Sequence, residues 1–213
     1  MVDEPNYIGI EGVIGVGKTT LATILAEKIG AQLQLEEVEA NPFLERFYDD
    51  MRGYAFQTQI FFLLSRYRQQ LDLAQASLFR QKVVSDYIFS KDRIFAYINL
   101  NDDELALYER LVKILEKDIL KPDILVYLQA SPGVLMSRIE KRGRPFEKNM
   151  PQDYIETLNN AYNYFFFHYT ETPLVIVNTD SLDLVNSYIH VQRLLEVINT
   201  HKKGTIYYKG GSD

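Results

Sequence analysis

A cluster of glycines followed by a lysine and two threonines stands near the amino end of the chain. The segment 12–20 reads GVIGVGKTT; it follows the apolar run 7–10 and leads into the helix-like segment 21–29. Glycines at positions 12, 15 and 17 let the backbone curl with its N–H groups pointing inward, where they can hold the oxygens of a polyphosphate. A helix that starts at Lys18 adds the positive end of its dipole. The spacing therefore predicts a phosphate-binding loop between a strand and a helix.

The residue types in this loop indicate which atoms would meet the phosphates. In the general motif the lysine, here Lys18, neutralises the β and γ phosphates, and the hydroxyl after it, here Thr19, helps hold Mg²⁺. A glycine-rich turn that happens to precede a lysine is the alternative, but the match at every fixed position favours a nucleotide site. We assign the nucleotide contacts to the whole loop: Gly12, Val13, Ile14, Gly15, Val16, Gly17, Lys18, Thr19 and Thr20.

Two carboxylates follow predicted strands. The segment 32–36 alternates polar and apolar side chains and ends at Glu36, which places this carboxylate at the carboxyl edge of a sheet, where ligands bind in open α/β folds. The acidic string 36–39 is equally compatible with a solvated loop. The apolar run 82–86 ends at Asp86, the pattern of a buried parallel strand that presents a carboxylate at the same edge. Asp86 is thus a candidate metal ligand.

Three arginines lie close together further along the chain. Arg138 and Arg142 are four residues apart and share a helix face, while Gly143 breaks the helix and frees Arg144 to swing. A solvated helix end is one interpretation of this basic cluster. In an acidic chain with a phosphate loop we favour a lid that closes over phosphates.

A long helix is predicted from Tyr54 to about Phe79, with apolar side chains on one broad face. Gln59 and Arg66 lie beside that stripe, and taken alone they are ordinary exposed helix residues. Helices are also predicted over 89–97 and 103–118, and these could pack together or against a second copy of the chain. The helix from Gln152 to Tyr169 is rich in Tyr and Phe, which we interpret as core packing.

Strand and helix patterns alternate along the chain. Strands are predicted near 7–10, 32–36, 82–86, 122–128 and 174–177, with helices between them and a last helix over 185–198. This alternation predicts an α/β fold with a five-stranded parallel sheet flanked by helices. We expect one domain over residues 1–201 and a loose tail over residues 202–213.

Composition restricts the class of partner. The 213 residues carry a net charge of -6 and include 46% hydrophobic side chains, enough for a core. The negative field repels nucleic acid polymers and anionic membranes, and no run of 18 apolar residues is present to span a bilayer. The chain has no cysteine, and its acidic start does not resemble a secretion signal, so we expect a cytoplasmic protein.

Taken together, the motifs resemble those of the deoxynucleoside kinases, and most closely the bacterial members that act on purines. The resemblance covers nearly the whole chain up to about Asn186. It rests on blocks in a fixed order: EGVIGVGKT at 11–19, EEVEANPFL at 36–44, FY at 47–48, FQTQ at 56–59, SR at 65–66, DYIFSKD at 86–92, FA at 95–96, RIEKRGR at 138–144, and Glu147. The resemblance implies a P-loop kinase fold with an arginine-rich lid, and ATP and Mg²⁺ as cofactors.

The resemblance also implies roles around the sugar and the phosphates. Glu36 would be the general base that takes the proton from the sugar 5′-hydroxyl, and Tyr48 and Glu147 match residues that hold the 3′-hydroxyl. The lid arginines on the phosphates are matched by Arg138, Arg142 and Arg144. The implied catalytic set is Glu36, Lys18, Arg138 and Arg142.

For the base, the resemblance implies three contacts. Gln59 matches a glutamine whose amide pairs with the base edge, and a side-chain amide can donate and accept at once, as it does toward adenine. Arg66 and Asp92 match its helpers on the exocyclic groups.

One block departs from the family pattern. Most members carry Asp/Glu-Arg-Ser after the third strand, and this chain has Asp86-Tyr87-Ile88. The arginine that would touch both base and phosphate is therefore missing; Tyr87 stands in its place among the substrate contacts, and Lys91 is a possible substitute. Glu37, where many members have proline, leaves open which of two glutamates acts.

Our hypothesis is an ATP- and Mg²⁺-dependent kinase that makes the 5′-monophosphate of a purine deoxynucleoside in nucleotide salvage, with deoxyadenosine first and deoxyguanosine or deoxycytidine as further candidates. Family precedent implies a homodimer built on the long helices. A nucleoside monophosphate kinase of the thymidylate type is the nearest rival, although the acidic region 36–48 argues against a phosphorylated acceptor. A non-catalytic kinase-like subunit is the rival from another class.

Overall fold

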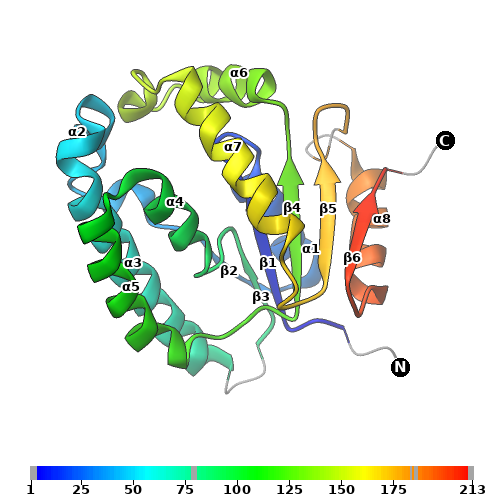
Figure 1. The fold of residues 1–213 in the computed structure, drawn as a ribbon. Coiled ribbons are helices and arrows are strands. Elements are labelled where there is room, and N and C mark those ends of the chain that lie inside the picture. Colours follow the sequence, from blue (N-terminus) through cyan, green and yellow to red (C-terminus); the bar gives the residue numbers. More distant parts are fainter. Residues whose placement is uncertain (1–3, 78–80, 183, 185–186, 211–213) are drawn as a thin grey trace.

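A parallel sheet forms the centre of the molecule in this computed structural model, which describes residues 4–77, 81–182, 184 and 187–210. The described residues contribute six strands in the order β2-β3-β1-β4-β5-β6, and every neighbouring pair runs parallel (Figure 1). Their bounds are β1 Tyr7–Gly12, β2 Gln32–Gln34, β3 Val83–Ser85, β4 Ile124–Gln129, β5 Leu174–Asn178 and β6 Thr205–Tyr208. The sequence thus predicted the α/β class and the first five strands.

The sixth strand corrects the expectation of five strands and of a loose tail after residue 201. β6 lies beside β5 with Leu174 opposite Thr205, and the Tyr208 hydroxyl donates a hydrogen bond to the His190 carbonyl oxygen at 3.0 Å. Its sequence, Thr-Ile-Tyr-Tyr, has high strand propensity. A segment of only four residues, followed by a glycine-rich end, is too short to show a clear periodicity. The pairing with β5 is what makes this segment a strand.

Eight α-helices connect and cover the strands within the described ranges. Three short 3₁₀ turns also occur, at Val38–Ala40, Glu116–Asp118 and Pro145–Glu147. The α-helix bounds are α1 Lys18–Ile29, α2 Leu44–Asp49, α3 Met51–Ser77, α4 Lys91–Asn99, α5 Asp102–Leu115, α6 Pro132–Arg142, α7 Gln152–Phe167 and α8 Tyr188–Thr200. The predicted helices over 54–79 and 185–198 extend onto residues 78–79 and 185–186, which lie outside the described part of the chain.

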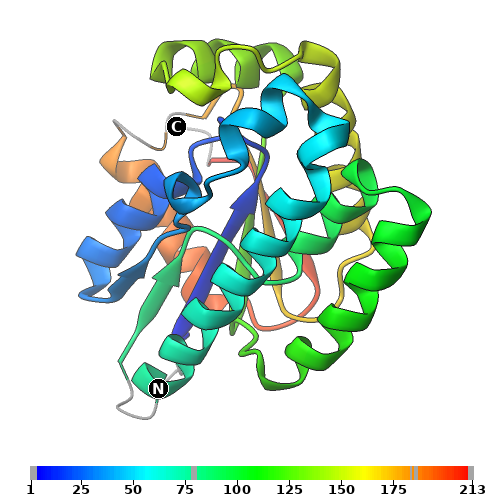
Figure 2. The same cartoon turned by 90° about the vertical axis from the view of Figure 1, so that its left-hand side faces the viewer.

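The helices form two layers around the sheet. In Figure 1, α1 and α8 lie on one side of the strands, while α7 crosses the other side and is followed outward by α4, α3 and α5. Figure 2 turns the outer surface of α3 and α5 toward the viewer. All residues of β1 are buried, and the Tyr127 ring of β4 lies 4.1 Å from the Phe166 ring of α7. Aromatic side chains of α7 therefore pack against the sheet, as predicted.

The sheet order places the loop after β1 at the centre of one edge. The chain passes from β1 to β2 on one side, returns through β3, and then crosses β1 to build β4, β5 and β6 on the other side. Ligands bind in open α/β sheets at such a switch point, outside the carboxyl ends of the strands. In Figure 1, α6 lies across this carboxyl edge. None of the helices in the described residues is long and apolar enough to cross a membrane.

Candidate active site

The loop between β1 and α1 has the backbone that the glycine spacing predicts. Gly12 and Gly15 have φ angles of 152° and 85°, which L-residues rarely adopt. A Cβ at Gly12 would lie 2.5 Å from the Leu128 carbonyl oxygen of β4, and one at Gly15 would lie 2.9 Å from the Leu135 carbonyl oxygen of α6. Only glycine allows the loop to lie this close to β4 and to α6.

Lys18 folds back over the loop that precedes it. Its Nζ donates hydrogen bonds to the carbonyl oxygens of Gly12 and Val13 at 2.8 and 3.2 Å. Burial, reinforced by the positive charge of Lys91, lowers the pKa of Lys18 to about 8. Gly12 and Val13 thus serve the site by holding Lys18, while the residues from Ile14 to Thr20 line the cavities described next.

A cavity of about 710 Å³ lies over the loop and the start of α1. The lid arginines form its far wall, and Arg138 is fixed in place: its Nη1 donates to the Thr179 hydroxyl at 2.9 Å and to the Val16 carbonyl oxygen at 3.2 Å. Nine basic and hydroxyl side chains line this cavity, beside apolar residues and Asp180: Lys18, Thr19, Thr20, Arg138, Lys141, Arg142, Arg144, Thr179 and Ser181. Such a wall suits a polyphosphate.

Thr19, which lines this cavity, lies in contact with Asp86. The Thr19 hydroxyl donates to Asp86 Oδ2 at 2.5 Å, and Asp86 Oδ1 accepts the Glu36 backbone N–H at 2.8 Å. No group of three or more acidic or histidine side chains in the described residues is arranged to hold a metal alone. A hydroxyl and a carboxylate nevertheless fit Mg²⁺, which keeps several waters and takes its other ligands from substrate phosphates.

A second cavity, of about 170 Å³, adjoins the first and lies between α2, α3, α4 and α7. Five residues line both cavities: Gly15, Lys18, Thr19, Arg142 and Arg144. The wall of the second cavity also holds five of the predicted substrate residues: Glu36, Tyr48, Gln59, Arg66 and Glu147. Residues that are far apart in the sequence therefore converge next to the phosphate loop.

Glu36 lies between two cations. Its Oε1 accepts a hydrogen bond from Arg66 Nε at 2.9 Å and a second from Nη2, and its Oε2 accepts one from Lys91 Nζ at 2.7 Å. Burial alone would raise the pKa of Glu36, but Lys91 and Arg66 outweigh burial and hold the pKa well below its ordinary value. Glu36 is thus ionised. Glu37 is exposed and does not line the cavity, so the geometry favours Glu36 of the two glutamates.

The base-binding residues that the sequence predicted divide into two groups. Gln59 and Arg66 line the second cavity, whereas Asp92 does not. Asp92 is 1% exposed; it accepts hydrogen bonds from Arg66 Nη1 and, at 2.8 Å, from the Tyr108 hydroxyl, and its backbone carbonyl oxygen accepts one from Gln59 Nε2 at 2.8 Å. The structure therefore places Asp92 behind the cavity wall, where it orients the two residues that form the wall.

Tyr87, the other predicted substrate contact of this block, lies in the core. Its side chain is fully buried and lines neither of the two cavities at the carboxyl edge, so it does not replace the missing arginine as a substrate contact. The side-chain period in an extended segment sends Tyr87 to the side opposite Asp86. Lys91, the first residue of α4, is the cation of this sequence block that lines the second cavity.

The lid joins the two cavities. Arg142 Nη2 contacts Glu147 Oε1 at 2.6 Å, and Arg144 Nε lies 3.7 Å from Glu39 Oε1. Phe146 lies between Arg144 and Glu147 in the sequence. Its ring is stacked on the ring of Tyr48, a half-buried residue, with 6.5 Å between the two centroids. One short segment therefore supplies arginines to the phosphate side and an aromatic ring and a carboxylate to the other side.

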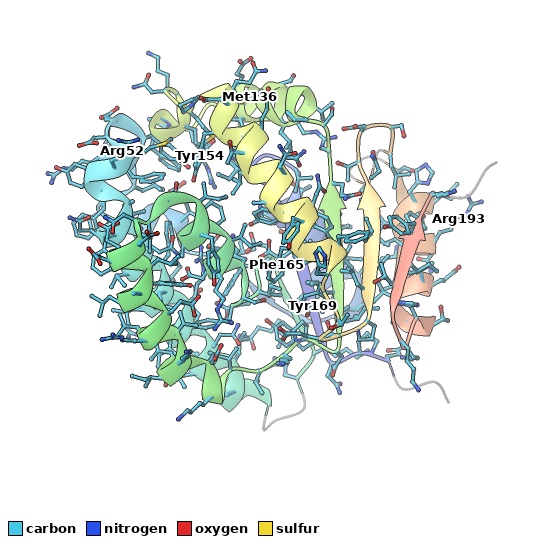
Figure 3. The ribbon with its side chains drawn as sticks, in the orientation of Figure 1. Arg52, Met136, Tyr154, Phe165, Tyr169 and Arg193 are labelled. Carbon is cyan, nitrogen blue, oxygen red and sulfur yellow. The ribbon has the colours of Figure 1, made fainter. Side chains whose placement is uncertain are left out.

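Some residues of the site were missed from the sequence. Tyr154 and Tyr162 of α7 line the second cavity in addition to packing in the core; Tyr154, labelled in Figure 3, lies between α7 and α2, 6.1 Å from the Phe47 ring. No periodic signal separates such a residue from an ordinary core aromatic. Thr179 follows β5 directly, so the rule that selected Glu36 and Asp86, a polar residue just after a strand, would have found it.

Comparisons with known proteins agree with this geometry. The sequence pattern of the family described as deoxynucleoside kinase matches residues 8–203. The chain is 39% identical over 193 residues to a deoxyguanosine kinase of Bacillus subtilis (strain 168), covering 88% of this chain and 93% of the relative. It is 31% identical to a deoxyadenosine kinase of Lactobacillus acidophilus, covering 91% and 95% of the two chains.

Solved structures show the same fold. The structure of deoxyadenosine kinase from M. mycoides with bound dATP superposes with a TM-score of 0.79 at 29% sequence identity, covering 91% of this chain and 99% of that one. The family match, the relatives and the shared fold lead to one conclusion. The chain belongs to the deoxynucleoside kinase family and is a phosphotransferase.

Proposed function

We propose that this enzyme uses ATP and Mg²⁺ to phosphorylate the 5′-hydroxyl of a purine deoxynucleoside. The observation that carries the proposal is the pair of adjoining cavities, which share Lys18, Thr19, Arg142 and Arg144. A polyphosphate in the larger cavity and a nucleoside in the smaller one would meet at these shared residues. Holding donor and acceptor in this way can supply a large part of the catalysis in a phosphoryl transfer.

In the proposed reaction, the 5′-oxygen forms a bond to the γ-phosphorus of ATP while the bond from that phosphorus to the β,γ-bridging oxygen breaks, and ADP leaves. Glu36 accepts the proton of the 5′-hydroxyl. Its low pKa makes it a weak base, which suffices because the transition state of phosphoryl transfer is loose and the proton moves late. A carboxylate has about four lone-pair positions, so Glu36 can accept the hydroxyl while it keeps Arg66 and Lys91.

The phosphate side of the reaction is assigned to the loop, the lid and the metal. Lys18 and the lid arginines bind and orient the phosphate oxygens. Bound Mg²⁺ would neutralise the β- and γ-phosphate oxygens, with Thr19 and Asp86 as its protein ligands. On the sugar side, Tyr48 and Glu147 line the second cavity and are our candidates for the 3′-hydroxyl.

The free hydrogen-bonding groups of Gln59 favour a purine base, and the two purines to compare are adenine and guanine. Its Nε2 already donates one hydrogen to the Asp92 carbonyl oxygen, so one N–H and the Oε1 atom remain for a base edge. That pair matches adenine. Arg66, the residue that would recognise guanine, is already engaged by Glu36 and Asp92, which favours deoxyadenosine. The relative that is 39% identical is named a deoxyguanosine kinase, so deoxyguanosine is the second candidate, ahead of deoxycytidine.

The test is to incubate the purified chain with ATP, Mg²⁺ and each deoxynucleoside in turn and to measure the 5′-monophosphate formed. We expect the highest kcat/KM with deoxyadenosine. A higher kcat/KM with deoxyguanosine would reverse the order of the two purines, and a preference for pyrimidines would contradict the proposal for the base. If no deoxynucleoside is phosphorylated with ATP, the proposed reaction is wrong.

We also propose a homodimer formed by α3 and α5. Leu64 and Leu71 are seven residues apart on α3 and are 50% and 38% exposed, and Leu107 and Ile114 are seven apart on α5 and are 48% and 66% exposed. Seven residues bring side chains back to the same face of a helix. Figure 2 shows α3 and α5 beside each other on the outside of the molecule. An apolar surface of this kind is typical of an interface between subunits.

A further inference from the structure

A buried lysine in the second cavity has no role in the reaction described so far. Lys91 is 3% exposed, lines the cavity and is the first residue of α4. We propose that Lys91 is a second catalytic lysine, whose ammonium contacts both Glu36 and the phosphoryl group as it passes from the donor to the 5′-oxygen. This inference rests on the proposed function, because it concerns the same transfer.

The position of Lys91 is electrostatically unfavourable for a residue that serves only the fold. A helix N-terminus carries a partial positive charge, so a cation in the first turn of α4 is repelled by it. Burial of an ammonium adds a further desolvation cost. Glu36 offsets part of this cost through the 2.7 Å hydrogen bond from Lys91 Nζ to its Oε2. A bound anion would offset the rest.

Lys91 also has donors to spare. An ammonium carries three N–H groups. Among the hydrogen bonds of the described residues, Nζ donates one, to Glu36, and it also lies 5.8 Å from the centroid of the Phe95 ring. Two N–H groups thus remain for oxygens that enter the cavity.

Lys91 lies on the side of the second cavity that is near the phosphate loop. The charge of Lys91 interacts with that of Lys18 in the loop and with that of Glu11 at the end of β1. Arg66, by contrast, contacts the other oxygen of Glu36 and is held by Asp92, on the side of the base residue Gln59. Lys18 and Lys91 both line the second cavity, so both cations lie where the donor and the acceptor would meet. Cations fixed there stabilise the charge of the transition state without rearrangement.

A purely structural role for Lys91 makes a different prediction. Arg66 already binds Glu36 through two nitrogen atoms, so Glu36 keeps an ionic partner when Lys91 is removed. If Lys91 only helped to fix Glu36, its loss would have a small effect on turnover. If it contacts the phosphoryl group, its loss affects turnover strongly and substrate affinity weakly, because the contact strengthens during the reaction.

The experiment compares Lys91→Met and Lys91→Arg with the wild type and with Lys121→Met. Lys121 is the matched control: it forms an ion pair with Glu171 at 2.9 Å, is 66% exposed and lies outside both cavities of the site. With ATP, Mg²⁺ and the best deoxynucleoside, we expect Lys91→Met to lower kcat by about 100-fold or more. The KM values for both substrates should change by less than about threefold, as for a contact made in the transition state. Lys91→Arg, which keeps a cation with N–H donors, should recover at least about tenfold of that loss.

Thermal unfolding of the free protein shows whether Lys91→Met folds. If it does not, a second variant provides the test. In Lys91→Ala, added n-propylammonium can occupy the space of the missing side chain, and tetramethylammonium, which has no N–H donor, is the control for ionic strength. We expect saturable recovery of kcat with the first amine and none with the second. Equal effects of the two amines on folded Lys91→Ala would overturn the inference.

The remaining outcomes separate the inference from the proposed function. A kcat of Lys91→Met within about threefold of the wild type, or a loss confined to the KM of the nucleoside, would overturn the catalytic role of Lys91 alone. If the wild type and Lys121→Met both fail to phosphorylate any deoxynucleoside, the proposed function is wrong and this inference falls with it.

Discussion

At the scale of single residues, the chemistry of the site centres on Glu36 and the groups that fix it. Asp86 accepts a hydrogen bond from the backbone N–H of Glu36, while Arg66 and Lys91 bind the two carboxylate oxygens of Glu36. These partners come from three places in the fold: Asp86 directly follows β3, Arg66 belongs to α3 and Lys91 to α4. A glutamate whose backbone is fixed by one partner and whose carboxylate is fixed by two others has little freedom to turn away from an acceptor hydroxyl, which is the preorganisation that an enzyme needs.

We predict that Glu36→Gln lowers turnover by about two or more orders of magnitude, because an amide cannot take the proton of the 5′-hydroxyl. ATP affinity should stay close to that of the wild type, since Glu36 does not line the larger cavity. Steady-state kinetics and equilibrium binding of ATP measure the two effects separately. Glu37→Gln is the matched control, because Glu37 is the exposed neighbour. A large loss of turnover in Glu37→Gln, with Glu36→Gln active, would show that the assignment is off by one residue.

At the scale of elements, the lid depends on how α6 ends. Gly143 has a φ angle of 67°, and its N–H donates to the Ile139 carbonyl oxygen at 3.1 Å, which closes the last turn of α6. The chain then leaves the helix axis and brings Arg144 to the wall that both cavities share. Glycine is suited to this position because it adopts the left-handed conformation without strain.

We predict opposite changes in stability for two glycines of this segment. Gly143→Ala should lower the free energy of unfolding by about 1 kcal/mol, because alanine is strained at positive φ. Gly133→Ala should raise it by about 0.5 kcal/mol, because Gly133 lies inside α6 and its added methyl group meets open space. Urea unfolding of the two variants beside the wild type measures both values. Changes of the same sign would contradict this account of the lid.

At the scale of the whole molecule, the two cavities exist because elements far apart in sequence meet at one edge of the sheet. The loop after β1, the residues after β2 and β3, and the lid after β4 all lie at carboxyl ends of parallel strands. The outer surface of α3 and α5 lies at the side of the molecule, whereas α6 lies across this edge (Figures 1 and 2), so the proposed dimer would form away from the carboxyl ends of the strands.

We predict that Ile114→Glu converts a dimer of the wild type into a monomer, because it buries a charge in the proposed apolar interface. Phe167→Glu is the matched control: Phe167 is 78% exposed, but it lies at the end of α7 and away from α3 and α5. Light scattering after size-exclusion chromatography, at several protein concentrations, gives the mass of each variant. A monomeric wild type, or a dimeric Ile114→Glu, would contradict the proposed interface.

The sequence by itself determined the parts of this protein that depend on local rules. Glycine spacing before Lys18 predicted the phosphate loop, apolar runs predicted five of the strands, and the position of a carboxylate just after a strand selected Glu36 and Asp86. These features follow from backbone geometry and from periodicities of a few residues, which any stretch of chain carries within itself.

Only the tertiary structure decided the features that depend on contacts between distant segments. β6 is a strand because β5 offers it a ladder of backbone hydrogen bonds, Asp92 lies behind the cavity because Arg66 and Tyr108 occupy its carboxylate, and Tyr87 is a core residue because it lies on the buried side of its segment. Lys91 reaches Glu36 across 55 positions of the chain. Spacing along a sequence does not report which side chains meet across such separations, because packing of the whole fold sets those distances.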